Sequence, residues 1–219
     1  MWGIQMINID LKSKLYFVLI PTVLLTFLLA LIFDKNLGDI SSWLFVVPKV
    51  IAIEALSFWL FQTFLWKWKI FRKWLVLFPD LGGTWIGEIQ SDYPNPKTDR
   101  QIKPIPCMSV VAHRFNQIKF KIKTIESESI SFSEQLLFDK ANHSKRITYS
   151  YVNDPNLLLD YRSDSHKGTT ILNLIGDDKM EGYYFTSRGN KGTITLTRFS
   201  KKMLDELPSE IAKHPMKNK

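Results

Sequence analysis

Hydrophobic residues are unevenly distributed along the chain. Residues 15–33 (LYFVLIPTVLLTFLLALIF) are 19 consecutive positions without a charged side chain. A helix needs about 17–25 apolar residues to cross a bilayer, so this run predicts a membrane span. The alternative is a secretory signal peptide with Lys12 and Lys14 as its basic start, but such a segment has a shorter apolar core that ends in small residues. This run ends in Ile32-Phe33-Asp34, and we favour the span.

A second apolar stretch follows a polar turn at residues 34–39 (DKNLGD). Residues 50–66 contain one charge and are just long enough to cross a membrane, and we place the second span at about 43–66. Residues 41–48 either lie at the membrane interface or extend the helix beyond Pro48. The first 79 residues therefore predict an α-helical membrane hairpin with two spans.

The cations that flank the two spans predict their orientation. Lys12 and Lys14 precede the first span, four cations lie within residues 67–73, and the connecting turn contains only Lys35. The positive-inside rule then places both termini in the cytoplasm, which predicts a multi-pass membrane protein with a short hairpin turn outside. Three tryptophans interleave with the second set of cations, as expected among lipid headgroups: Trp66, Trp68 and Trp74.

Glu54 is an ionisable residue inside the second predicted span. Such residues are costly in a membrane and by default suggest a functional position. One interpretation is that Lys49 extends to the interface and Glu54 reaches back toward it. The other is that Glu54 faces another helix and helps an oligomer or a pore to form.

From residue 80 onward the pattern changes from continuous apolar to alternating. In residues 117–125, Ile118, Phe120 and Ile122 alternate with lysines, which predicts a strand with one buried and one solvated face. The segment LGGTWIGEI at residues 81–89 begins a strand with glycines where backbones approach or bend. The eight predicted strands are 84–91, 105–114, 117–125, 129–138, 146–152, 168–175, 179–187 and 192–200, with a less certain piece at 157–161.

These strands follow one another without an intervening helical pattern, so a parallel sheet is disfavoured. Consecutive antiparallel strands are expected to close into a barrel, because closure removes exposed edges. The predicted fold is therefore a two-span helical hairpin (residues 1–79) followed by an all-β, antiparallel, eight-stranded, lipocalin-like barrel (80–200). Residues 201–219 are expected to be a polar tail. An eight-stranded barrel has room for side chains or one small ligand.

Composition and charge narrow the possible functions. The 219 residues carry 29 Lys and Arg against 21 Asp and Glu, and the net charge of +8 divides into +4 for residues 1–79 and +4 for 80–219. The barrel is therefore nearly balanced and unlike a general DNA or RNA binder. Cys107 is the only cysteine, which excludes a disulfide framework. No metal-ligand spacing, Walker loop or nucleophile elbow is present, so we predict no catalytic residues, metal or cofactor.

A ligand-binding barrel needs convergent polar groups among apolar walls. For a phosphorylated ligand with bases, arginines and hydroxyls would bind the phosphates and tyrosines would stack on the bases. The alternatives are packing of each tyrosine in the core or wall, and a solvated strand face for each arginine. Alternation places Tyr184, Thr186 and Arg188 on one face, but leaves open which face points inward. The candidates are Arg114, Tyr149, Tyr151, Tyr161, Tyr183, Tyr184, Thr186, Arg188 and Arg198.

The whole layout resembles a known family. Two amino-terminal spans, LGGTWIG at residues 81–87, and a barrel that ends with GYY at 182–184 and GTITLTR at 192–198 resemble the CD-NTase-associated transmembrane β-barrel effectors of CBASS antiphage defence, type fifteen (Cap15-like). The resemblance covers nearly the whole chain and rests on architecture together with a glycine–tryptophan strand motif.

This resemblance implies a receptor and a membrane-active effector in one chain. In that family the cytoplasmic barrel binds a cyclic dinucleotide made by a partner nucleotidyltransferase. Homo-oligomerisation follows, the spans cluster in the lipid bilayer, and the inner membrane is disrupted, which leads to cell death or growth arrest. The candidate residues above come from their chemistry and not from a family motif. The alternatives are a membrane-anchored, lipocalin-like barrel that binds an apolar small molecule, or a barrel that binds a protein partner.

Overall fold

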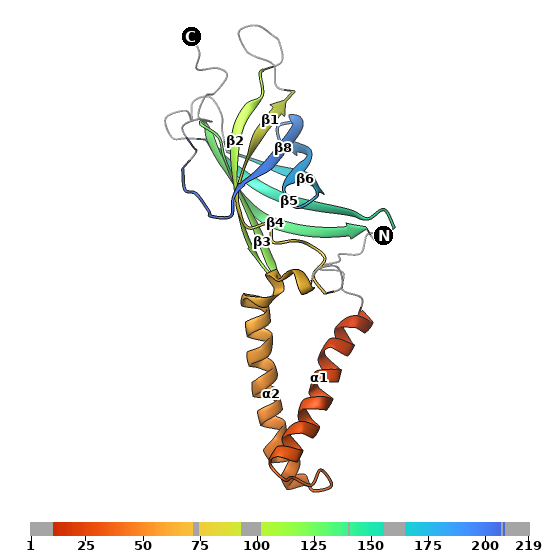
Figure 1. Ribbon diagram of the computed structural model, residues 1–219. Helices are drawn as coiled ribbons and strands as arrows, with labels where there is room; N and C mark the ends of the chain where they lie inside the picture. The colour runs from red at the N-terminus through yellow and green to blue at the C-terminus, as the bar shows by residue number, and fades with distance from the viewer. Residues whose placement is uncertain are drawn as a thin grey trace. The chain divides into compact units, whose positions relative to one another are not determined.

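The structure is a computed structural model that describes residues 11–71, 75–92, 102–139, 141–155, 165–206 and 208. Contacts divide the chain into two units, one within residues 8–77 and the other within residues 78–219. The first unit is helical and the second is a β-barrel (Figure 1).

The helical unit is a hairpin of α1 (Leu11–Ile32) and α2 (Ile40–Thr63). The helices pack together near the turn that joins them, where Leu29, Val46 and Val50 are buried, and they diverge away from it (Figure 1). Most of the other large apolar side chains of both helices are exposed. The predicted helical hairpin is therefore confirmed.

Among the described residues, α2 is the one helix long and apolar enough to cross a membrane, and the apolar part of α1, Val18–Ile32, is shorter. α2 begins at Ile40 and ends at Thr63, so it lies three residues earlier at each end than we predicted. Residues 41–48 belong to the helix, which continues through Pro48. A proline is tolerated in such a helix because neighbouring groups can satisfy the carbonyl that loses its partner.

Glu54 contacts the other helix of the hairpin. The hydroxyl of Thr22 lies 2.5 Å from Oε1 of Glu54, whereas Nζ of Lys49 donates to the carbonyl oxygen of Phe45 and lies 3.3 Å from the centre of its ring. The interpretation in which Glu54 reaches back toward Lys49 is wrong, because residues five apart point to different sides of a helix. Glu54 does face another helix, which here is α1 of the same chain.

Eight strands form the second unit. The strands are β1 (Gly83–Ser91), β2 (Ile105–Arg114), β3 (Gln117–Lys123), β4 (Ser127–Asp139), β5 (Ser144–Pro155), β6 (His166–Ile175), β7 (Lys179–Thr186) and β8 (Lys191–Ser200). Each strand pairs antiparallel with the next, and β8 pairs with β1 to close the barrel. The predicted fold class is confirmed, although β5 is longer than expected. The less certain piece at 157–161 lies outside the described residues.

Alternate side chains of the strands fill the barrel. Trp85, Cys107, Phe120, Tyr149 and Leu196 are fully or almost fully buried, and the rings of Phe120 and Tyr149 stack with their centres 4.5 Å apart. Burying one such large apolar side chain stabilises a fold by roughly 1.5–3 kcal/mol. The strands also approach closely at Gly87, where a Cβ atom would collide with the carbonyl oxygen of Thr195, as its place in the strand motif predicted.

The chain after β8 crosses the outer face of the barrel. The hydroxyl of Thr84 donates to the carbonyl oxygen of Lys202 at 2.7 Å and accepts the N–H of Leu204 at 2.9 Å. Met108 points outward from β2 and is nevertheless fully buried. Residues 201–206 form no helix, and apart from residue 208 the rest of the predicted tail lies outside the described residues.

Candidate ligand site at the barrel mouth

The antiparallel order gives the barrel two chemically different ends. Odd-numbered strands end, and even-numbered strands begin, at the same end of the barrel. We call this end the mouth and the opposite one the closed end. The candidate residues are divided between them.

Tyr151, Tyr184 and Thr186 converge at the mouth. Tyr151 near the end of β5 pairs with Gly168 of β6, and Gly168 pairs in turn with Thr186 of β7. Tyr184 pairs with Gly192 at the start of β8. Paired residues of neighbouring strands point to the same face. This face is the interior, because Tyr151 lies two positions after the buried Tyr149 on β5 and therefore points to the same side.

Each of these tyrosines lies across a glycine of the adjacent strand. A Cβ atom at Gly192 would stand 2.8 Å from Cε1 and 2.9 Å from the hydroxyl oxygen of Tyr184, and one at Gly168 would collide with the hydroxyl of Tyr151. The missing side chains of the two glycines therefore provide the space that the phenol rings occupy. The two tyrosines cover the mouth end of the barrel interior.

Both phenols are neutral at physiological pH. Burial is the main cause that raises the pKa of Tyr151, and the neighbouring Tyr184 raises it further. Burial also raises the pKa of Tyr184, while a hydrogen bond with Ser91 acts in the opposite direction. A neutral phenol donates one hydrogen bond and presents an aromatic face, so each tyrosine can serve a phosphate oxygen or a base.

The hydroxyl of Thr186 is buried, and among the described residues nothing hydrogen-bonds to it. Buried polar groups are normally paired, so an unpaired one needs an explanation. Ser129 at the mouth is paired within the protein, because its hydroxyl donates to Oδ1 of Asn153 at 2.7 Å. The buried hydroxyls of Ser109 and Tyr149, further inside the barrel, also lack a partner among the described residues. Thr186 is the one of these three that lies at the mouth, where a ligand could reach it.

Exposed cations stand on the rim of the mouth. Lys167 is the second residue of β6, Lys191 begins β8, and Arg188 lies in the turn between β7 and β8. The turn is fixed to β6, because the N–H of Ser187 donates to the carbonyl oxygen of Lys167 at 2.8 Å. These cations lie beside the tyrosines, where the phosphates of a ligand entering the barrel would pass. The carboxylate of Asp92, which accepts the N–H of Lys191 at 2.9 Å, lies at the same rim.

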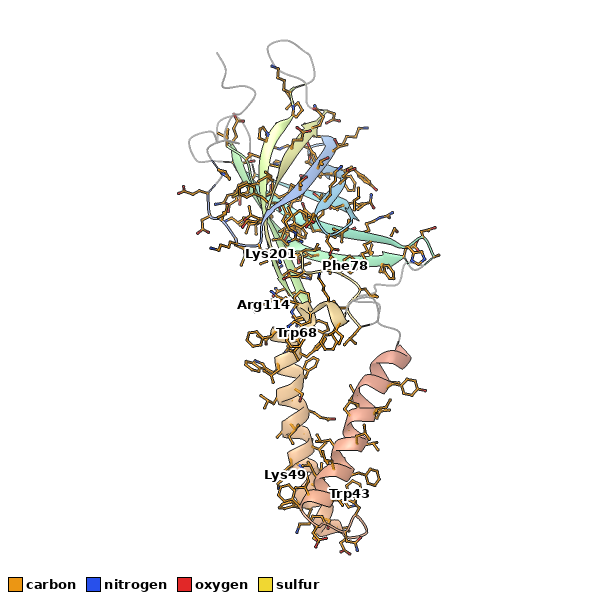
Figure 2. The ribbon with its side chains drawn as sticks, viewed as in Figure 1. Trp43, Lys49, Trp68, Phe78, Arg114 and Lys201 are labelled. Atoms are coloured by element: carbon orange, nitrogen blue, oxygen red, sulfur yellow. The ribbon has the colours of Figure 1, made fainter. Side chains whose placement is uncertain are left out.

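The structure places other described candidates away from this site. Tyr183 points outward, is 47% exposed and lies beside Phe185. Arg114 is exposed at the end of β2, at the closed end (Figure 2). A cleft of about 110 Å³ near it, between the β2–β3 hairpin and β4, is smaller than the 300 Å³ or more of usual ligand pockets. Tyr161 lies outside the described residues.

Arg198 closes the opposite end of the barrel instead of binding at the mouth. Its guanidinium lies 4.4 Å from the centre of the Trp85 ring. It donates to the carbonyl oxygens of Asp80, Gly82 and Asp177 at 2.9–3.0 Å, and to Oδ1 of Asp178 at 3.0 Å. Our prediction of Arg198 as part of the ligand site is therefore corrected, because protein acceptors already occupy this side chain.

Several residues at the mouth were not among our candidates. Ser91, Asn153 and the rim cations Lys167 and Lys191 all lie there, and Gly168 and Gly192 shape it. The sequence held a signal for Asn153, which alternates with Tyr149 and Tyr151 on one face of β5. The signal for the two glycines was weaker. Only the register shows that they lie opposite aromatic residues near the starts of their strands.

Comparison with known proteins gives two matches. Residues 76–198 match the family described as Cap15, cyclic dinucleotide receptor domain. The chain is also similar to CD-NTase-associated protein 15 of Staphylococcus schleiferi, with 22% identity over 173 residues that cover 78% of this chain and 88% of the relative. The family match contains the residues named above at the mouth and ends at Arg198.

Proposed function

The chain belongs to the Cap15 family of cyclic dinucleotide receptor domains, and we propose that it is a membrane-anchored CBASS effector whose barrel binds a cyclic dinucleotide at the mouth. The ligand would come from a CD-NTase, as the name of the staphylococcal relative indicates for that protein. The observation that carries the assignment of the site is the convergence of Tyr151, Tyr184 and the hydroxyl of Thr186, which has no partner among the described residues, beside the cations of the rim.

The chemistry of the mouth suits a ligand with two bases and two phosphates. Each tyrosine can stack on one base, which is worth about 1–3 kcal/mol per base. The hydroxyl of Thr186 can donate to a phosphate oxygen, and Lys167, Arg188 and Lys191 can neutralise the two negative charges. In the structure the tyrosines lie over Gly168 and Gly192, so binding requires that they turn away from the glycines toward the ligand.

The barrel interior favours this site over a lipocalin-like cavity for an apolar ligand. Towards the closed end the interior is filled by large buried side chains, among them Trp85, Phe120 and Leu172. An apolar ligand would need that space. A nucleotide held by the mouth needs only the polar end of the barrel, where the tyrosines and Thr186 lie.

The membrane part of the proposal is that both helices span the inner membrane, with both termini in the cytoplasm. α1 has 22 residues and α2 has 24, which gives each a length of about 33–36 Å at 1.5 Å per residue. Ligand binding would cause homo-oligomerisation of the chain, clustering of the hairpins and disruption of the membrane. The Thr22–Glu54 contact supports this role by joining each hairpin into one unit.

The central experiment is a titration of the full-length protein in lipid nanodiscs with a panel of cyclic dinucleotides. We expect at least one ligand to bind with Kd below about 10 µM, which corresponds to about −7 kcal/mol. Tyr184→Leu, which removes the stacking ring at the mouth, should weaken binding, and Tyr183→Leu on the outer face is its matched control. A panel without any binding would overturn the receptor assignment, and equal loss in both variants would overturn the site.

The membrane role has a separate test. Deletion of residues 1–66 should abolish toxicity in cells that also produce the cyclic dinucleotide. Glu54→Leu should weaken toxicity, and Glu54→Gln, which can still accept the hydrogen bond from Thr22, should preserve it. Toxicity that survives the deletion would contradict the proposed mechanism.

A further inference from the structure

The segment that follows α2 combines exposed apolar side chains with lysines. We call residues 64–71 (FLWKWKIF) the collar. It contains two short 3-10 helices, Leu65–Lys67 and Lys69–Phe71. In Figure 2, Trp68 of the collar lies at the end of α2 opposite to the end where Trp43 and Lys49 lie.

The backbone of the collar is irregular. The last helical hydrogen bond of α2 runs from the N–H of Phe64 to the carbonyl oxygen of Leu60, and Phe64 has a non-helical φ of −125°. Trp68 then adopts an extended conformation between the two 3-10 helices. Irregular backbone exposed to lipid is not tolerated in the hydrocarbon region, because its polar groups find no partner there. The collar is therefore suited to the headgroup layer, directly after the apolar helix.

The side chains of the collar separate into an inner and an outer set. Trp66 is 2% exposed, and the rings of Phe61 and Phe71 meet edge to face with centres 5.2 Å apart. Phe64, Trp68 and Ile70 are instead 57%, 58% and 71% exposed. Aromatic and apolar groups in this arrangement are typical of the interface between membrane and water.

The charged side chains of the collar and of the chain beside it are all positive. Lys67 and Lys69 are exposed, and residues 55–79 contain no Asp or Glu. The other end differs, because in the turn that joins α1 to α2 the cation Lys35 lies between Asp34 and Asp39. Attraction to an anionic surface is therefore expected at the collar and not at the turn.

We propose that the collar binds the phosphate headgroups of anionic phospholipids, such as phosphatidylglycerol, in preference to zwitterionic lipids. Lys67 and Lys69 supply the charge, while Trp68 and Ile70 insert among the acyl chains. A membrane is favoured over a nucleic acid or an acidic protein because the collar continues directly from α2, the candidate span. This lipid selection does not depend on the nucleotide and fixes the depth at which α2 enters the membrane.

The test measures which lipids the full-length protein retains. The protein is placed in nanodiscs with equal amounts of phosphatidylglycerol and phosphatidylcholine, extracted with mild detergent, and its bound lipids are quantified by mass spectrometry. Each lysine near an anionic surface contributes about fivefold to the preference, so Lys67→Gln together with Lys69→Gln should lower the retained ratio on the order of thirtyfold, or to unity. Lys67→Arg with Lys69→Arg should keep it.

Two controls make the result decisive. Lys119→Gln with Lys121→Gln removes two lysines from the barrel and should leave the lipid ratio unchanged. Cyclic dinucleotide binding, measured on the same preparations, shows whether the glutamine variant is folded and tests the proposed function independently. A glutamine variant that retains the wild-type lipid ratio, or a barrel variant that loses it equally, would overturn the proposal.

Discussion

The two ends of the barrel differ in whether the chain itself satisfies the hydrogen bonds of their polar groups. At the closed end, Arg198 donates to three carbonyl oxygens and one carboxylate and covers Trp85. At the mouth, the buried hydroxyl of Thr186 has no partner among the described residues. Polar groups that the chain satisfies itself stabilise the fold, whereas polar groups left unsatisfied at an opening are available to a ligand. The comparison therefore supports our proposal that the closed end stabilises the fold and the mouth binds the ligand.

The largest expected effect is on stability, from Arg198→Met. The substitution leaves the part-buried carbonyl oxygens of Asp80 and Gly82 without this donor. The lost charged hydrogen bonds should lower the free energy of unfolding by about 3 kcal/mol. Thermal unfolding in detergent, followed by tryptophan fluorescence, measures the change. Nucleotide affinity per folded molecule should stay within about twofold of wild type.

Arg188→Met is the matched control for this variant, since Arg188 is exposed on the rim. It should weaken nucleotide binding and leave the melting temperature almost unchanged. If Arg198→Met instead abolished binding in protein that remains folded, the division between the two ends would not hold.

A smaller effect is expected on affinity from Tyr184→Leu. Leucine keeps an apolar side chain over Gly192 but cannot stack on a base. The loss of one stacking interaction of about 1–3 kcal/mol predicts binding roughly 5–150-fold weaker. Titration calorimetry on Tyr184→Leu and on the outward Tyr183→Leu provides the measurement. An equal loss in both would show that the two faces of β7 are not distinguished as proposed.

The sequence predicted the fold almost completely because the signals for it are local. Alternation in β3 follows from Ile118, Phe120 and Ile122, and the turn residues separate consecutive strands. The helix boundaries were less accurate. The sequence alone did not show that α2 continues through Pro48, because the cost of a proline depends on the surroundings of the helix.

The site was predictable only in part, because it depends on register. Tyr151 and Thr186 were among the candidates, but residues 35 positions apart meet only because both pair with Gly168. Arg198 could not be assigned to the closed end from its own strand, since its partners Asp80 and Gly82 come from the start of the barrel. Chemistry alone selects residue types, and the topology decides which of them share a site.

Tyr149, the fully buried tyrosine below the mouth, should make the stability of the protein depend on pH in alkaline solution. The expected fall in the free energy of unfolding is about 1.4 kcal/mol per pH unit. Burial raises its pKa, so the folded protein keeps a phenolic proton that the unfolded chain loses above about pH 10. This contribution to stability is complete below pH 10 and is lost as the pH rises toward the folded pKa.

The measurement is the melting temperature at about pH 10 and at about pH 11.5, on either side of the range where an exposed phenol titrates, for a variant of Tyr149 in the core and a variant of Tyr184 at the mouth. The melting temperature of Tyr149→Phe should decline less steeply with pH than that of the parent protein. The contribution of Cys107, whose pKa burial raises to about 12, is present in both proteins. Tyr184→Phe should change the slope less, because its hydrogen bond with Ser91 opposes the effect of burial. A steeper decline in Tyr149→Phe would contradict the burial of this phenol.

The smallest and most specific effect is expected from Thr186→Val, which changes one buried hydroxyl to a methyl group of similar volume. Because the hydroxyl lacks a partner among the described residues, its removal should leave the melting temperature unchanged or raise it slightly. The lost hydrogen bond to a phosphate should weaken nucleotide binding by about 1–1.5 kcal/mol, or roughly tenfold. Thr84→Val is the control, since the hydroxyl of Thr84 has two partners in the chain. It should lower stability without changing affinity. If Thr186→Val instead lowered stability and left affinity unchanged, Thr186 would belong to the fold. The observation on which the site rests would then be removed.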